Sequence, residues 1–412
     1  MNDRFPAGPT WMCALLAIVA CSSDTPESPF VSIQAIETPA GAGSGEPFLS
    51  TDGSAVYMSW LEEAPEGAYD LRFSALREGA WDEPRTVERS DGFFVNWADF
   101  PSVTPTPDGT LWAHWLQRGA MGGYDYGVRV VRSSDGGRTW SDPWTPHEDG
   151  TPTEHGFVSV LPMADGVGLT WLDGRRYVEG PDGAPATSEM TLRFRAVGAQ
   201  RGPGAETLVD ARVCDCCQTD AVMTTAGPVV VYRDRTAEEI RDIYVTRLVD
   251  GAWTEGVPVH DDGWEIGGCP VNGPATAARG DQVAVAWFTG AGEVPRVKVA
   301  FSSDAGATFA PAVVVDDGNP IGRVDVLHVG QDRVVVSWLE QTGEEIAALR
   351  VREVRADGSM SPSGTVSESS AARASGFPRM APTPDGGVVL AWTDVSSEDA
   401  RIRMSKLQLE GT

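Results

Sequence analysis

The chain has 412 residues, of which 41% are apolar, and this share is typical of a soluble globular protein. Its 59 acidic residues outnumber 32 basic ones, so the net charge is −27. A surface this acidic repels phosphate backbones, and the composition therefore argues against nucleic acid as a partner. The abundant glycine and proline residues (46 and 29) are expected where many short strands are joined by turns.

The N-terminus carries an apolar run, from Trp11 to Ala20, that is too short to span a bilayer. Small residues end this run, as they do before the cleavage point of an export signal. The cysteine that follows, Cys21, resembles the lipidated cysteine of the bacterial lipobox. The resemblance implies a signal peptide over residues 1–20 and a tether over residues 21–29. With Ser22 next, it also implies the outer membrane of a bacterial cell envelope, on its periplasmic or surface face, with membrane contact through the lipid alone. The alternative is a cytosolic protein with an apolar N-terminus.

A strand that ends in an aromatic residue recurs along the rest of the chain. The seven aromatic residues are Trp60, Trp115, Trp171, Tyr232, Trp287, Trp338 and Trp392, at gaps of 55, 56, 61, 55, 51 and 54 residues. A period in this range predicts a propeller or a solenoid. The strands are β-branched and flanked by turn residues, which favours the propeller, and we interpret the seven aromatic residues as packing residues.

Each repeat contains a first strand, a tight turn, the aromatic-ending strand, a variable loop and a third strand, followed by a turn into a fourth strand. Four strands are one blade, so the sequence predicts an all-β, seven-bladed propeller in a single domain over residues 30–412. The seventh unit stops after its third strand. We expect the segment from Val31 to Ile36 to supply the missing outer strand and close the ring, which removes free sheet edges. Propellers are often monomeric, and we expect a monomer.

Two turns carry a further motif. The segments Ser133-Ser-Asp-Gly-Gly-Arg-Thr-Trp140 and Ser302-Ser-Asp-Ala-Gly-Ala-Thr-Phe309 resemble the Asp box of the sialidase (BNR-repeat) superfamily. The resemblance implies a sialidase-type propeller, for which six blades are the alternative to seven, and places the Asp boxes on the face opposite the active site. Sialidases also carry an early arginine in a Phe/Tyr-Arg-Ile-Pro motif, whereas the corresponding region here, residues 43–49, has no arginine.

The loops after second strands and those leading into first strands open on one face of a propeller, around its channel. We call this face the mouth. Four cysteines fall in the loops leading into the fourth and fifth units, namely Cys214, Cys216, Cys217 and Cys269. In an exported chain they predict disulfides, and a bridge from Cys269 to one of the other three would staple the two blades. The alternative is a metal site, in which the thiolates, with His155 nearby, would hold copper(I) or zinc.

Arginines form a second group at the predicted mouth: Arg175, Arg233, Arg235, Arg241, Arg323 and Arg379. Guanidinium groups bind carboxylates through paired hydrogen bonds, so these residues favour an anionic ligand such as an acidic sugar. We add Asn272 to this ligand site, together with Trp97 and Trp264, which could stack on a sugar ring. The alternative for each arginine is pairing with an aspartate in its own loop.

Three functions remain open from the sequence. The first and favoured one is a displayed propeller that binds an anionic glycan or a protein partner at the cysteine- and arginine-rich mouth. The second is an exo-glycosidase of the sialidase type, with Asp234, Glu239 and Glu265 as candidate acids and Tyr177 or Tyr232 as a candidate nucleophile. The third is a thiolate metal-binding or redox protein.

Overall fold

The computed structural model describes residue 1 and residues 30–410, apart from 180–185, 200 and 398. The predicted signal peptide, the tether and Cys21 lie outside the described residues. In the part of the chain that is described, no helix is long and apolar enough to cross a membrane.

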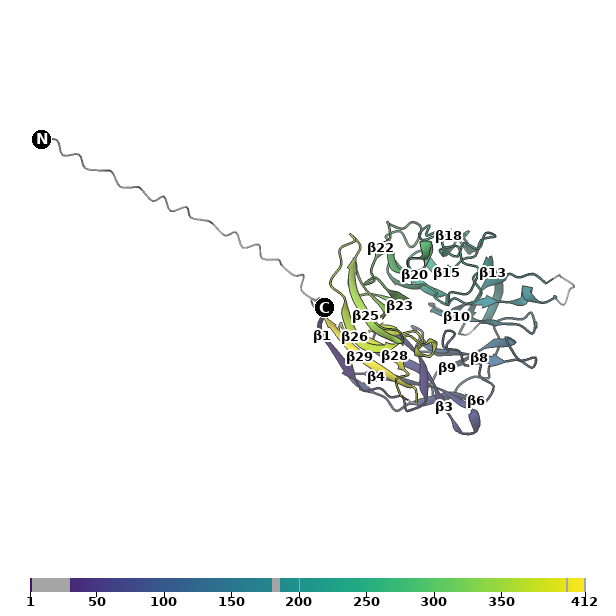
Figure 1. Ribbon diagram of the computed structural model, residues 1–412. Coiled ribbons are helices and arrows are strands. Elements are labelled where there is room, and N and C mark those ends of the chain that lie inside the picture. The colour runs from purple at the N-terminus through teal and green to yellow at the C-terminus, as the bar shows by residue number, and fades with distance from the viewer. Residues whose placement is uncertain (2–29, 180–185, 200, 398, 411–412) are drawn as a thin grey trace.

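Seven antiparallel sheets follow one another along the described chain as the seven blades of a β-propeller, which confirms the predicted fold class (Figure 1). We number the blades from the N-terminus. Blade 1 contains β2 (Ser44–Thr51), β3 (Val56–Glu63), β4 (Tyr69–Arg77), β5 (Ala80–Trp81) and β6 (Arg85–Ser90). Blade 2 contains β7 (Ser102–Pro105), β8 (Leu111–Arg118) and β9 (Tyr126–Ser133). Blade 3 contains β10 (His155–Pro162), β11 (Val167–Asp173), β12 (Met190–Gly198) and β13 (Gly202–Val213).

The remaining blades repeat this order. Blade 4 contains β14 (Asp220–Thr224), β15 (Gly227–Arg233), β16 (Ile243–Val249), β17 (Ala252–Trp253) and β18 (Val257–Pro258). Blade 5 contains β19 (Ala275–Arg279), β20 (Gln282–Thr289), β21 (Arg296–Ser302) and β22 (Val313–Val314). Blade 6 contains β23 (Pro320–His328), β24 (Arg333–Gln341), β25 (Ile346–Arg355) and β26 (Gly364–Ser370). Single 3₁₀ turns lie in four of the loops: η1 (Pro65–Gly67), η2 (Arg175–Tyr177), η3 (Ala291–Glu293) and η4 (Arg373–Ser375).

Blade 7 joins the two ends of the chain, as the sequence predicts. It contains β27 (Arg379–Pro382), β28 (Val388–Asp394) and β29 (Arg401–Leu409), and its outer strand is β1 (Phe30–Ile36). β1 pairs antiparallel with β29, with Ile36 opposite Met404 (Figure 1). The first strands of successive blades contact one another around the channel, and β27 contacts β2. The ring is therefore closed without a free sheet edge between its first and last blades.

Three blades depart from the four-stranded prediction. In blades 1 and 4 the outer strand is in two pieces, since β5 and β6 both pair with β4, and β17 and β18 both pair with β16. In blade 2 the fourth strand is incomplete. After β9 the chain returns along the blade, but only two isolated bridges pair it with the sheet, Val130 with Trp144 and Tyr126 with Glu154. Pro143 and Pro146 flank Trp144, and proline has no N–H to donate to a ladder. The fourth strand of this blade is therefore reduced to isolated bridges.

The hydrophobic core of the described chain is divided into seven clusters, each between two neighbouring blades. Each cluster holds one of the seven repeat aromatic residues, and all seven are at most 5% exposed. Trp60, for example, packs between blades 7 and 1, and Trp171 between blades 2 and 3. The repeat period therefore arises because each blade inserts one large ring toward the blade before it.

Both Asp-box turns have the hydrogen bonds that their residues predict. Asp135 accepts the N–H of Thr139 at 3.0 Å and its hydroxyl at 2.7 Å, and Asp304 accepts the same two groups of Thr308 at 2.9 and 2.7 Å. Gly137 has a φ of +79° and lies so close to Phe73 of blade 1 that a Cβ would come within 2.2 Å of the ring. The glycine of this motif therefore serves both the turn and the contact between blades.

Candidate functional site

Two loops at the mouth bring the four cysteines together. Cys214, Cys216 and Cys217 lie between β13 and β14, in the loop leading into blade 4, and Cys269 lies between β18 and β19, in the loop leading into blade 5. Gly273 donates its N–H to the Gln218 side chain at 2.9 Å. A Cβ on Gly273 would lie 2.1 Å from the Gln218 carbonyl oxygen. A glycine is therefore required where the two loops meet.

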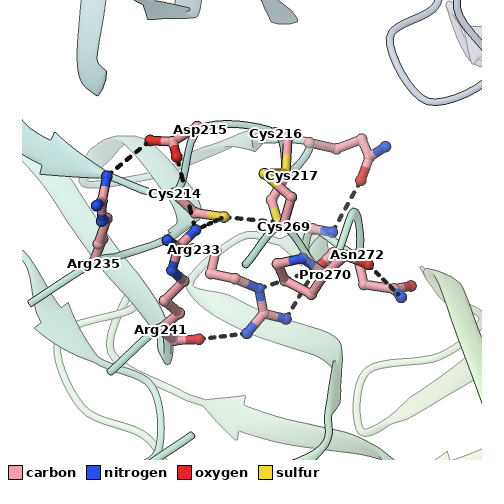
Figure 2. The surroundings of a disulfide bond; sticks show 12 residues. Cys214, Asp215, Cys216, Cys217, Arg233, Arg235, Arg241, Cys269, Pro270 and Asn272 are labelled. Atoms are coloured by element: carbon pink, nitrogen blue, oxygen red, sulfur yellow. Dashed lines mark hydrogen bonds and ion pairs between the residues drawn. A yellow bond between two sulfur atoms is a disulfide. The ribbon is translucent and has the colours of Figure 1, made fainter. Parts of the chain in front are cut away.

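A disulfide joins the two loops. It links Cys216 to Cys269, across a sequence separation of 53 residues (Figure 2). Cys269 is exposed and Cys216 is half-buried. The bridge belongs to the type that the sequence predicts, from Cys269 to one of the three cysteines before blade 4. In the chain-entropy description, closing a loop of this length stabilises the folded state by about 4 kcal/mol.

The other two cysteines form a buried dithiol beneath this disulfide. Cys214 is 1% exposed and Cys217 is 2% exposed, and their Sγ atoms lie 3.1 Å apart. Arg241 points its Nη1 at the Cys214 sulfur from 3.5 Å (Figure 2). Cys214 and Cys217 are spaced as Cys-x-x-Cys, a spacing of redox-active dithiols.

Arg233 places a buried positive charge next to this dithiol. The residue is 1% exposed, and its guanidinium donates to the backbone carbonyls of Asn272, Phe288 and Arg241 at 2.5 to 3.1 Å. Within the described residues, no carboxylate lies within 4.0 Å of it. A buried cation without a counter-ion is costly, so Arg233 favours an anion nearby, and the neighbouring sulfurs can supply it.

The two thiols of the dithiol differ in their pKa values. Burial raises the pKa of Cys214, but the hydrogen bond with Cys217 and the charges of Arg233 and Arg241 outweigh it and lower that pKa to about 6. Burial raises the pKa of Cys217 well above its ordinary value, and the thiolate at Cys214 raises it further. Of the two thiols, Cys214 is therefore the one that loses its proton first, and Cys217 the one that keeps it.

Arg241 and Arg235 share one pair of carboxylates. Glu239 accepts from Arg235 and Arg241 at 2.8 Å each, and Asp215 lies 3.3 Å from Arg235 and 3.9 Å from Arg241 (Figure 2). The hydrogen bonds of the two arginines lower the pKa of Glu239 to about 2. Of these two arginines, only Arg241 reaches the Cys214 sulfur.

The remaining predicted arginines are also bound to protein groups. Arg175 pairs with Asp173 at 2.6 Å and with Glu206 at 2.9 Å. Arg323 donates to the Ala372 carbonyl at 3.0 Å and to the Ser375 hydroxyl at 2.6 Å, and burial lowers its pKa to about 10. Arg379 lies 3.6 Å from Asp325 and lines a cavity of about 420 Å³ in the channel.

The two tryptophans and the asparagine of the predicted ligand site pack against this framework. Trp264 is 9% exposed, and the Arg233 guanidinium lies 4.9 Å over its ring. Trp97 stacks on Phe377 at 5.8 Å and has Arg323 over its ring at 5.0 Å. Asn272 accepts the N–H of Arg323 at 2.8 Å and donates to the Ile321 carbonyl at 3.3 Å, so it joins the loops of blades 5 and 6.

His155 belongs to a separate charged cluster. Its Nε2 lies 3.1 Å from Asp149 and its Nδ1 lies 3.0 Å from the Thr153 carbonyl, so both ring nitrogens face acceptors. Its ring stacks on His147 at 3.8 Å. Burial lowers the pKa of His155, but Asp149 and Asp173 outweigh it and raise that pKa overall. With both nitrogens engaged, His155 offers none to the cysteines.

The predicted catalytic residues are distributed over the mouth. Asp234 follows β15, and burial and the charge of Asp210 raise its pKa to about 7. The Tyr177 hydroxyl donates a hydrogen bond to Asp215, and burial and this hydrogen bond raise the pKa of Tyr177. Glu265 is exposed and forms a backbone bridge with Ile240. Tyr232 is 1% exposed, and its hydroxyl donates to Asp210 at 2.6 Å.

Two acidic residues of the mouth have no assigned role in the sequence prediction. Asp215 links Tyr177, Arg235 and Arg241, and burial, followed by the charge of Asp215, raises the pKa of Glu154 to about 7. Asp215 lies inside the cysteine motif, and that position is the signal that could have identified it. Glu154 directly precedes His155 in the loop leading into blade 3, which places it at the mouth, but nothing in the sequence gives it a role among 59 acidic residues.

Comparisons with known proteins bear on the fold. No family model matches the chain, and no curated protein sequence matches it. A protein of unknown function from Dyadobacter fermentans matches over 92% of this chain and 99% of its own, with a TM-score of 0.51 and 15% identity. The polysaccharide lyase Uly1 matches over the same shares, with a TM-score of 0.53 and 9% identity. The likeness is one of fold.

The NanB sialidase from Streptococcus pneumoniae is also similar in structure, with a TM-score of 0.47 and 12% identity over 92% of this chain and 70% of its own. Folds of this kind carry many functions, so function must be argued from the residues of the site.

Proposed function

We propose that the protein carries out thiol–disulfide exchange, with the Cys214–Cys217 dithiol at the mouth of the propeller as its redox centre. The observation that carries the proposal is a pair of buried sulfurs 3.1 Å apart. Arg241 contacts one of them at 3.5 Å, and the buried charge of Arg233, which has no carboxylate partner among the described residues, lies beside them. The dithiol would give two electrons and one proton to a disulfide substrate, which takes a second proton from solvent, and would become a Cys214–Cys217 disulfide. The Cys214 thiolate is the nucleophile and Cys217 the resolving thiol.

The favoured sequence hypothesis, an anionic ligand at the arginines, has less support. Five of the six guanidinium groups donate hydrogen bonds to protein groups, which a ligand carboxylate would have to displace. The sixth, Arg379, forms an ion pair with Asp325 at 3.6 Å. The sialidase-type hypothesis has less support as well, because Glu239 is held by two arginines and the candidate acids are spread over several loops. Hydrolysis of a fluorogenic sialoside, lost in Asp234→Ala, would reverse this ranking.

Dithiothreitol-driven reduction of insulin disulfides tests the proposal. The wild-type protein should accelerate insulin reduction, and Cys214→Ser should lower that acceleration at least tenfold. Asp304→Asn is the matched control, because it alters an Asp-box turn and leaves the cysteines in place, and it should retain the wild-type rate. A wild-type rate equal to that of dithiothreitol alone would contradict the proposal.

Copper or zinc on the same sulfurs is the competing hypothesis. A site made of all four sulfurs requires the Cys216–Cys269 disulfide to open, because a sulfur in a disulfide is not a thiolate ligand. Elemental analysis of protein purified under reducing conditions distinguishes the two. One tightly held metal ion per chain, with no acceleration of insulin reduction, would favour the metal hypothesis.

We also propose that the protein works in the cell envelope, anchored through Cys21. An oxidising compartment agrees with the presence of a disulfide between Cys216 and Cys269. Cell fractionation tests this: the wild type should partition with the membranes, and Cys21→Ser should move it to the soluble fraction. A wild-type protein that stays in the cytosol would contradict the assignment.

A further inference from the structure

The four sulfurs of the site differ in their access to solvent. Cys269 is exposed, Cys216 is half-buried, and Cys217 and Cys214 are 2% and 1% exposed. An external protein or small thiol can therefore reach Cys269 but has no direct path to the dithiol. Cys216 lies between the exposed cysteine and the buried dithiol. It is bonded to Cys269, and its Sγ lies within 4.8 Å of those of both Cys214 and Cys217.

We propose that the Cys216–Cys269 disulfide is the exchange port of the redox centre, through which the buried dithiol trades its electrons with external thiols and disulfides. The proposal rests on the proposed function, since it gives the route by which that dithiol reacts. The proposal gives Cys269 a role in the reaction, in addition to the cross-link that it forms between two loops. The external partner is a protein or small molecule with a thiol or a disulfide.

The internal reaction is an exchange of one disulfide for another. The Cys214 thiolate attacks the Cys216 sulfur, the Cys216–Cys269 bond breaks, and Cys269 leaves as a thiolate that takes a proton from solvent. Cys217 then attacks Cys214, passes its proton to the departing Cys216 sulfur, and completes a Cys214–Cys217 disulfide. The disulfide has moved from the surface to the interior, and no external oxidant is consumed in this step.

The external reaction returns the port to its first state. With Cys216 and Cys269 now reduced, the Cys269 thiolate attacks a partner disulfide, and a partner thiolate leaves. Cys216 then attacks Cys269, closes the Cys216–Cys269 disulfide and releases the second partner thiolate. The partner gains two electrons, which come from the dithiol that the internal step oxidised, and its two thiolates take their protons from Cys216 and from solvent.

The arrangement of charges suits this direction of attack. Arg241 lies at 3.5 Å from the Cys214 sulfur, and Arg233 lies beside the dithiol without a carboxylate, so the attacking thiolate is stabilised inside the protein. The leaving sulfur, Cys269, is the one that water can stabilise. Nucleophile and leaving group are thus each stabilised by their own surroundings.

Differential alkylation of the full-length chain tests the port. The native protein is labelled over time with N-ethylmaleimide, then denatured, relabelled with a heavier maleimide and mapped by mass spectrometry. In the wild type, Cys269 should acquire the first label, because each internal exchange frees it. In Cys214→Ser this labelling should slow at least tenfold.

Cys217→Ser is the matched control, because it removes the other buried thiol but leaves the first attack possible. In this variant Cys269 should still be labelled, and a Cys214–Cys216 disulfide peptide should accumulate. Near-ultraviolet circular dichroism checks that both variants fold. Labelling of Cys269 at the same rate in Cys214→Ser as in the wild type, or no labelling in the folded wild type, would overturn the proposal.

These outcomes separate the port from the proposed function. If the wild type accelerates insulin reduction but Cys269 labelling is independent of Cys214, the redox function stands and the port is wrong. If insulin reduction is not accelerated, the redox function itself is wrong.

Discussion

Arg241 should lower the pKa of Cys214 through its direct contact with the sulfur, and replacing it should raise that pKa. The full shift, from 9.0 to about 6, corresponds to about 4 kcal/mol of thiolate stabilisation. A hydrogen bond to a charged group contributes about 1.5–3 kcal/mol. Because the Arg241 contact is long, at 3.5 Å, we expect the lower end, and Arg241→Met should raise the pKa of Cys214 by about one unit.

Arg235→Met is the matched control for this prediction. Arg235 binds the same two carboxylates, Glu239 and Asp215, and carries the same charge, but it does not contact the sulfur. The pKa of Cys214 is measured by following the ultraviolet absorbance of its thiolate as the pH is raised. The absorbance of Cys214→Ser at each pH is subtracted. Arg235→Met should shift that pKa by less than half of the shift in Arg241→Met. Equal shifts in the two variants, or none in either, would refute the reasoning.

Three further predictions concern stability. The double variant Cys216→Ser/Cys269→Ser should lose about 4 kcal/mol of unfolding free energy in urea titrations, because the bridge closes a loop of 53 residues; an unchanged midpoint would contradict this. Trp171→Ala should lower the free energy of unfolding by about 3–5 kcal/mol, since the ring fills the core between blades 2 and 3. A variant that unfolds at the same urea concentration as the wild type would refute this. His155 has a raised pKa, so its stabilisation is present below about pH 6.5. This stabilisation is lost as the pH rises through the pKa that His155 has in the folded protein. Over that pH range the melting temperature of the wild type should fall, and that of His155→Gln should fall less.

The fold could be predicted from the sequence because its signal is periodic and local. Each buried ring, from Trp60 to Trp392, occupies the same place in its blade, so one spacing reports seven contacts between blades. The segment that closes the ring was identifiable because the seventh unit lacks a fourth strand. The fourth strand of blade 2 was mispredicted because the two prolines around Trp144 remove the donors that a ladder needs.

The site was less predictable because it depends on side-chain direction. The sequence places four cysteines in two loops, but which sulfur bonds Cys269 depends on how the loop before blade 4 turns. Arg233 reads as a ligand-binding residue at the end of a strand, yet its guanidinium turns inward onto three backbone carbonyls. Burial of that charge, which gives the site its electrostatic character, has no sequence signature.

A redox titration with cysteine mapping tests the central claim most directly. The folded protein is equilibrated in glutathione buffers of increasing oxidised fraction, quenched with acid, alkylated and mapped. The account predicts that Cys214 and Cys217 pass together and reversibly from two thiols to one disulfide as the buffer becomes more oxidising. Thiols at Cys214 and Cys217 that persist in every buffer, or a disulfide between them that no buffer reduces, would contradict it.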